Sequence, residues 1–134
     1  MQYLLDTNIC IYLIKQRPAN VFEKFCALDI ADIGISSISV AELEYGVCKS
    51  QQQDKNKAAL MQFLIPLEIV EFDQAAATVY GTIRSDLERR GLVIGSLDML
   101  IDAHSLSLGV TLVSNNLREF SRIPNLSVEN WVDT

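Results

Sequence analysis

The chain has 134 residues, of which 49% are hydrophobic and 21% are charged, a composition typical of one compact domain and not of a disordered chain. Its net charge of −6 argues against a general affinity for nucleic acids, although a cluster of metal-binding carboxylates would itself account for much of that charge. Three cysteines without a Cys-x-x-Cys spacing indicate neither a disulfide framework nor a zinc site, and no apolar run is long enough to span a bilayer.

Apolar strands alternate with helices from the start of the chain. A buried strand is expected at Tyr3–Leu5, and it ends directly at Asp6. Thr7 and Asn8 are typical capping residues for the helix that follows, to Ile14. No basic segment precedes this strand and Asp6 interrupts it, so we expect no signal peptide, a cytoplasmic location and no membrane contact.

The later elements continue this alternation. Further helices are expected at Val21–Leu28, Ser39–Ser50, Ala58–Leu64, Gln74–Arg90 and Leu97–Leu108. Further strands are expected at Ile33–Ser36, Leu67–Val70, Val110–Val113 and Leu126–Trp131, and the polar segment Gln51–Lys57 is expected to be a loop. This order predicts an α/β fold with a mainly parallel sheet of about four to five strands, covered by helices on both faces, in a single domain at 1–134.

Four acidic residues fall where a strand passes into a helix or turn, or in the first turn of a helix: Asp6, Glu42, Asp98 and Glu119. The carboxyl ends of parallel strands meet at one edge of a sheet, where ligands bind in α/β proteins. Each acid also has a purely structural explanation. Asp6 and Asp98 would stabilise helix N-termini, and Glu42 would complete a capping box that begins at Ser39. Glu119 would pair with a neighbouring arginine, Arg118 or Arg122.

A second acid follows on the helix that carries Asp98. Asp102 lies four residues later on the same face, where two like charges destabilise a helix unless a cation is near. No cysteine joins these acids, and the one histidine, His104, lies off that face. Ligation by oxygen alone favours Mg²⁺, with Mn²⁺ as an alternative, and Mg²⁺ held by carboxylates is typical of phosphate-ester chemistry.

Taken together, the motifs resemble those of PIN-domain ribonucleases, and most closely those of the VapC toxins of bacterial toxin–antitoxin pairs. The segments that carry the resemblance are Leu5-Asp6-Thr7-Asn8, Ser39-Val40-Ala41-Glu42-Leu43-Glu44-Tyr45-Gly46, Ile94-Gly95-Ser96-Leu97-Asp98-Met99-Leu100-Ile101 and Thr111–Phe120, followed by Ile123-Pro124-Asn125-Leu126. The resemblance covers nearly the whole chain in the order and spacing of that family.

This resemblance implies that Asp6, Glu42 and Asp98 hold one or two Mg²⁺ ions. Many members have a fourth acid where this chain has Asn116, and Glu119 would supply the missing carboxylate. Asp102 stands where the family usually has a small residue, so it is either an additional ligand or incidental. Residues that would contact the metal or its waters are Asn116, Asp102, Thr7, Asn8 and Ser114.

The implied activity is Mg²⁺-dependent hydrolysis of RNA, with transfer RNA as a suggested substrate, by a toxin that inhibits translation. The implied partners are a cognate VapB-type antitoxin and a second copy of the chain, with operator DNA bound only through the antitoxin. Segments that would supply a partner surface are Ala58–Leu64 and Phe22–Leu28. Arginines that would contact RNA phosphates, or else form surface ion pairs such as Arg84 with Glu88, are Arg84, Arg89, Arg90, Arg118 and Arg122.

Three other functions share parts of this pattern. An aspartyl-phosphate phosphatase would use Asp6 as a nucleophile, but such sites pair Asp-x-Asp and the second position here is Asn8. A receiver domain would need a phosphoacceptor aspartate where the polar segment Gln51–Lys57 stands, and both classes normally use a late lysine, which is absent after Lys57. A catalytically silent binding module is favoured only by Asn116.

Overall fold

The computed structural model describes residues 1–132, apart from the side chains of residues 117 and 118. Its five strands are β1 (Tyr3–Leu5), β2 (Ile33–Ser36), β3 (Glu68–Val70), β4 (Thr111–Val113) and β5 (Val128–Glu129). They form one sheet in the order β3-β2-β1-β4-β5, and every neighbouring pair is parallel. The predicted α/β class, the parallel sheet and its strand number are therefore confirmed.

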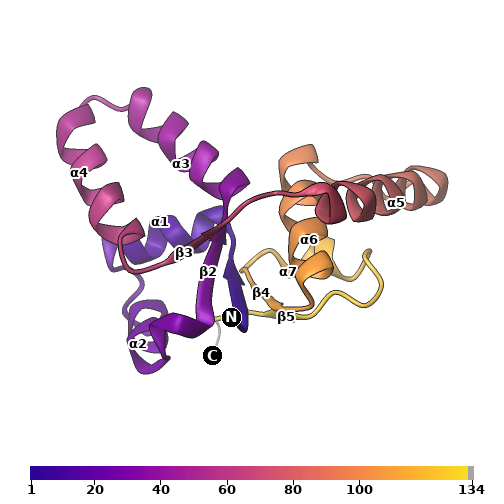
Figure 1. The fold of residues 1–134 in the computed structure, drawn as a ribbon, viewed down its shortest axis with the longest axis horizontal. Helices are drawn as coiled ribbons and strands as arrows, with labels where there is room; N and C mark the ends of the chain where they lie inside the picture. The colour runs from indigo at the N-terminus through magenta and orange to yellow at the C-terminus, as the bar shows by residue number, and fades with distance from the viewer. Residues whose placement is uncertain (133–134) are drawn as a thin grey trace.

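The helices of the described residues fall into two groups (Figure 1). Those to the left of the strands in that view are α1 (Thr7–Lys15), α2 (Ala19–Ala27), α3 (Ser37–Cys48) and α4 (Gln53–Leu64). Those to the right are α5 (Gln74–Arg90), α6 (Ser96–Leu108) and the short α7 (Leu117–Phe120). A 3₁₀ turn, Ile30–Asp32, leads into β2. None of these helices has both the length and the hydropathy needed to cross a membrane.

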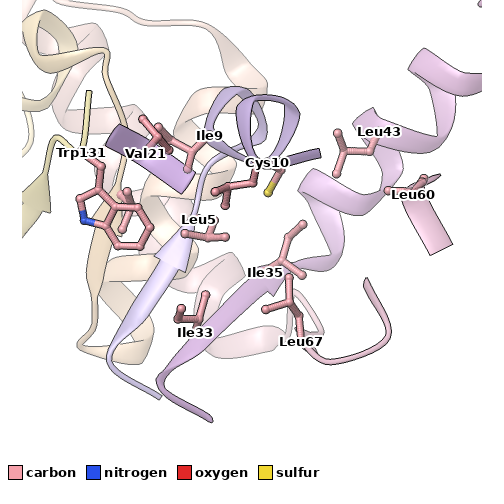
Figure 2. Packing of buried hydrophobic residues seen from close by; sticks show 12 residues of the cluster. Leu5, Ile9, Cys10, Val21, Ile33, Ile35, Leu43, Leu60, Leu67 and Trp131 are labelled. Atoms are coloured by element: carbon pink, nitrogen blue, oxygen red, sulfur yellow. The ribbon is translucent and has the colours of Figure 1, made fainter. Parts of the chain in front are cut away.

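Each group packs on its own apolar cluster. In the larger cluster, Leu5 of β1 and Ile35 of β2 meet Ile9 of α1 and Leu43 of α3, as Figure 2 shows. Trp131 closes this cluster near the C-terminus and is fully buried. The smaller cluster joins α5 to α6 and is built around buried residues Ile83, Leu87, Met99 and Ala103. The larger cluster fixes the strands relative to α1 and α3, and the smaller one fixes α6 relative to α5.

The register of the sheet brings three segments to one edge. Leu5, the last residue of β1, is opposite both Ile35 and Val113. The residues that follow, Asp6 and Ser114, continue the pairing, because the Asp6 amide donates to the Val113 carbonyl at 3.0 Å. Asp6 therefore lies beside the turn after β4, as the parallel sheet predicted.

The predicted capping box at Ser39 is wrong. Helix α3 begins at Ser37, and Ser36 is its N-cap, because the Ser36 hydroxyl accepts a hydrogen bond from the Ile38 amide at 3.1 Å. The strand ends on a serine that already supplies the capping oxygen, so the helix starts three residues earlier than the motif indicated. Ser39 instead is fully buried, and within the described residues its hydroxyl has no hydrogen-bond partner.

The N-terminal cap of α1 decides between two predictions, capping by Thr7 or Asn8 and stabilisation of the helix N-terminus by Asp6. Asp6 is the N-cap, and its carboxylate accepts a hydrogen bond from the Ile9 amide at 2.9 Å. Thr7 and Asn8 are the first residues of the helix and do not cap it. The Thr7 hydroxyl is thereby free to donate to Glu42 on α3, at 2.7 Å.

The polar segment Gln51–Lys57 is helical for most of its length, contrary to the expected loop. Helix α4 begins at Gln53, and its first turn is exposed. Glutamine and lysine have good helix propensity, and Asp54 lies in the first turn, where an acid suits the helix dipole, so polarity alone does not prevent a helix on the surface. Lys57 also pairs with Glu44 of α3, with 2.5 Å between Nζ and Oε2, which ties α4 to its neighbour.

Candidate functional site

A cavity of about 50 Å³ lies at the carboxyl edge of β1 and β4. Its lining residues are Asp6, Asn8, Asp98, Ile101, Asp102, Ser114, Asn116, Glu119 and Phe120. They come from the start of α1, from α6, from the segment after β4 and from α7. The structure thus brings together three of the four principal acids of the sequence prediction, together with Asp102 and Asn116.

Asp6 is half-buried at the N-terminus of α1. Burial raises its pKa from the ordinary 3.8 to about 6, since desolvation disfavours the charged form. Hydrogen bonds from Ser114 and from the Ile9 amide act in the opposite direction, and the charges of Asp98 and Glu42 raise the pKa further. The carboxylate is therefore held in place by its neighbours and is surrounded by like charge.

Helix α6 carries two acids into the cavity. Asp98 is exposed in the first turn, and Asp102 follows one turn later with 2% of its surface exposed. Burial, followed by the charges of Asp98, Glu119 and Asp6, raises the pKa of Asp102 to about 8. Within the described residues, its Oδ2 atom is buried and has no hydrogen-bond partner.

Glu119 enters the cavity from α7, whose N-cap is Asn116. Burial and the charge of Asp98 raise the pKa of Glu119, whereas a hydrogen bond from Asn116 lowers it. Asn116 thus lies where it contacts Glu119 directly, and the two residues occupy the same corner of the cavity.

Glu42 and Thr7 do not line this cavity. The Glu42 carboxylate accepts the Thr7 hydroxyl and borders a separate groove between α1, α3 and α4. Its charge nevertheless contributes to the raised pKa of Asp6, so it lies in the neighbourhood of that acid. The hydrogen bond from Thr7 to Glu42 links α3 to the first turn of α1, at the residue that follows Asp6.

The chemistry of the cavity fits a hard cation. The described side chains that line it offer carboxylate, amide and hydroxyl oxygens, and no described lysine, arginine, histidine or cysteine is among them. Carboxylates crowded in this way repel one another unless a positive charge lies between them. Within the described residues, no three acidic, histidine or cysteine side chains are already gathered into a metal-ligand geometry. The acids are thus in position, while coordination would require side-chain adjustment.

The arginines expected at phosphates are mostly engaged elsewhere. Arg84 pairs with Glu88 at 2.8 Å, and Arg90 pairs with Asp86 at 2.7 Å, all on the exposed surface of α5. Arg89 lies 3.4 Å from the same Asp86. Arg122 donates to the Val93 carbonyl at 3.3 Å, and the side chain of Arg118 lies outside the described part. The alternative of surface ion pairs is thus confirmed for α5.

Two residues of the cavity wall were not predicted, Ile101 and Phe120. Both are apolar and carry no chemical signal of their own. Ile101 lies three residues after Asp98, and this spacing places the two side chains next to each other on the helix. That spacing was the only feature of the sequence that could have predicted Ile101 in the wall.

Comparisons with known proteins agree with this geometry. The sequence model of the PIN domain matches residues 3–126. Ribonuclease VapC2 of Rickettsia felis is 46% identical over 132 residues, and tRNA(fMet)-specific endonuclease VapC of Shigella flexneri is 42% identical over 131 residues; each alignment covers 98% of both chains.

Solved structures give the same result. VapBC2 from Rickettsia felis, bound to a DNA fragment from the promoter, has a chain that superposes with a TM-score of 0.91 at 44% identity, covering 98% of this chain and 99% of that one. DNA-bound VapBC from Salmonella typhimurium gives 0.92 at 41% identity, covering 98% of each chain. PIN-domain nucleases depend on a metal, which agrees with the oxygen-lined cavity. The chain therefore belongs to the PIN-domain family and, within that family, to the VapC ribonucleases.

Proposed function

We propose that this protein is a Mg²⁺-dependent endoribonuclease, with Mn²⁺ as a substitute metal, and that it acts as the toxin of a toxin–antitoxin pair. The observation that carries the proposal is the cavity at the carboxyl edge of the sheet, where acids from α1, α6 and α7 converge with no described basic side chain among them. That donor set suits a divalent cation that binds phosphate oxygens.

In this proposal, Asp6 and Asp98 are the primary metal ligands. Bound Mg²⁺ would supply a water of lowered pKa and neutralise charge on the scissile phosphate. One oxygen of the Asp6 carboxylate, Oδ1, accepts from the Ile9 amide, which orients the group at the edge of the cavity. Glu42 and Glu119 would hold the metal through water or orient the attacking water, and the Thr7 hydroxyl would fix the direction of Glu42.

The substrate in this proposal is a structured RNA, and transfer RNA is the first candidate. The Shigella flexneri relative is named as a tRNA(fMet)-specific endonuclease. The net charge of −6 and the internal pairing of the α5 arginines leave little cationic surface for non-specific RNA binding. Recognition of one RNA shape therefore suits this chain better than indiscriminate degradation.

We further propose a VapB-type antitoxin as partner, a homodimer, the bacterial cytoplasm as location, and a single domain over 1–134. The related solved structures are VapBC2 of Rickettsia felis on a promoter fragment and DNA-bound VapBC of Salmonella typhimurium, so we propose that operator DNA is bound here only through the antitoxin. The apolar grooves beside α4, one of them lined by Phe22, Phe25 and Phe63, are candidate partner surfaces.

The test is incubation of purified protein with total RNA and with purified transfer RNA, in Mg²⁺ or in chelator. Discrete fragments should appear only with metal, and Asp98→Asn should abolish them while the circular dichroism spectrum stays unchanged. Asp54→Asn removes the same charge from the exposed start of α4 and is the matched control. Full cleavage by Asp98→Asn, or in chelator, would contradict the proposal. Metal binding without any cleavage would favour the silent module that Asn116 suggests.

A further inference from the structure

A carboxylate oxygen of Asp102 lies in the cavity and has no hydrogen-bond partner among the described residues. The side chain is 2% exposed, and its Oδ2 atom finds no hydrogen-bond donor among the described residues. Buried polar atoms in folded proteins nearly always have partners, and a buried carboxylate without one is costly unless it binds a cation or gives up its charge. This residue therefore requires an explanation beyond packing.

The surroundings of Asp102 indicate what is missing. Asp98 lies one helical turn before it on α6, and Glu119 faces the same cavity from α7. Ile101 and Phe120 supply the apolar part of the wall. No described side chain that lines the cavity is basic. The charge of Arg122, which is outside the lining, acts on Glu119 but not on Asp102, so a cation is the partner that Asp102 lacks.

We propose that Asp102 is itself a ligand of the divalent cation and binds it together with Asp98 and Glu119. The proposal rests on the proposed function, because it concerns the same metal site. Of these three acids, Asp102 is the most buried. It would therefore be the innermost of the three ligands. Asn116, which contacts Glu119, offers only a neutral amide, so Asp102 supplies charge that Asn116 does not.

The alternative is that Asp102 keeps a proton and fills space. The two explanations differ in what happens when the charge is removed. A ligand that becomes an amide loses its charged contact to the cation, whereas a protonated acid replaced by the amide of the same shape changes little. Asp102→Asn separates the two, and Asp102→Ala serves as a second variant because its smaller side chain cannot clash.

The experiment is titration of the metal-free protein with Mn²⁺, without RNA, followed by electron paramagnetic resonance of the free ion. We expect Asp102→Asn and Asp102→Ala each to weaken Mn²⁺ binding by about tenfold or more. Asp54→Asn should bind like the unchanged protein. Mn²⁺ affinity equal to that of the unchanged protein in both Asp102 variants would overturn the proposal.

A second measurement guards against misfolded variants. Mn²⁺ should raise the midpoint of thermal unfolding in the unchanged protein, since a ligand that binds only the folded state stabilises it, and the rise should be smaller in either Asp102 variant. RNA cleavage by the unchanged protein is scored separately. If the unchanged protein cleaves RNA but both Asp102 variants bind Mn²⁺ as tightly as it does, only the role of Asp102 is overturned. If the variants bind Mn²⁺ more weakly but none of the proteins cleaves RNA, only the nuclease assignment is overturned.

Discussion

At the scale of single residues, Asp6 combines two tasks that the sequence left as alternatives. It caps α1 through the Ile9 amide and also lines the acidic cavity. The prediction that an acid would stand at this edge followed from one strand ending at residue 6. The sequence also offered capping of the helix by Asp6, but only as an alternative to a role in the site, and Thr7 and Asn8 are themselves good capping residues; the backbone geometry at the junction decided which residue caps α1.

The two tasks of Asp6 are separable by substitution. Asparagine is as good an N-cap as aspartate, so Asp6→Asn should abolish RNA cleavage and leave the free energy of unfolding nearly unchanged. Asp6→Ala should abolish cleavage and also cost about 1 kcal/mol through loss of the cap, offset in part by relief of charge repulsion in the cavity. Urea unfolding of both variants measures the difference. Equal cleavage by Asp6→Asn and the unchanged protein would remove Asp6 from the metal site.

The contact between Thr7 and Glu42 gives a second residue-level prediction. The 2.7 Å bond joins residues 35 positions apart, and no motif in the sequence marks it. If it orients Glu42, Thr7→Val should reduce the RNA cleavage rate by about tenfold, whereas Thr7→Ser keeps the hydroxyl and should retain most of the rate.

Single-turnover cleavage at saturating Mg²⁺ is the measurement for this pair. Both variants should unfold within about 1 kcal/mol of the unchanged protein, the ordinary worth of one hydrogen bond. Identical rates for Thr7→Val and Thr7→Ser would show that the bond has no part in positioning Glu42.

At the scale of elements, the reliability of each prediction followed the number of independent local signals. Helix α5 was predicted with its observed bounds, because Asp73 caps it through the Ala76 amide and Gly91 ends it in the left-handed region at φ 69°. Helix α4 was predicted too short because its start has no capping side chain. Helix α3 was placed too late because two serines, Ser36 and Ser39, both match a cap.

The two serines give a paired test of that assignment. Ser36→Ala should destabilise the protein by about 1–2 kcal/mol, because it removes the cap of α3 and the partner of His104 Nδ1 at 2.8 Å. Ser39→Ala should be neutral or stabilising by up to about 1 kcal/mol, since it removes a buried hydroxyl with no partner among the described residues. Chemical denaturation measures both. A larger loss of stability with Ser39→Ala than with Ser36→Ala would instead support a cap at Ser39.

At the scale of the whole molecule, the acids of the cavity set how stability depends on pH. In the folded, metal-free protein the pKa of Asp6 is raised to about 6 and that of Asp102 to about 8, from an ordinary 3.8. The folded state therefore binds protons more tightly than the unfolded chain. The contribution of these two acids to the free energy of unfolding is therefore greatest at low pH. It falls as the pH rises through these values, by up to about 1.4 kcal/mol for each unit of pKa difference.

We therefore expect the free energy of unfolding in chelator to fall between about pH 4 and about pH 8. Asp102→Asn should remove the fall above about pH 6 and about half of the fall below it, where Asp6 also contributes. Added Mn²⁺ should reduce the fall, because the metal binds the deprotonated acids. The single tryptophan, Trp131, is fully buried, so its fluorescence reports unfolding at each pH. A metal-free protein that grows more stable from pH 6 to pH 8 would contradict the raised pKa values.

The sheet order described above also determines when the protein can become active during its own synthesis. Strand β1 is made first but lies at the centre of the sheet, and its neighbour β4 comes more than 100 residues later. Asp6 therefore leaves the ribosome before Asp98 and Glu119 exist. A nascent chain that ends before β4 carries Asp6, Glu42 and Asp98, but it lacks the central neighbour of β1 and the segment after it that brings Ser114, Asn116 and Glu119 to the cavity. The full set of acids is thus assembled only when the chain is nearly finished.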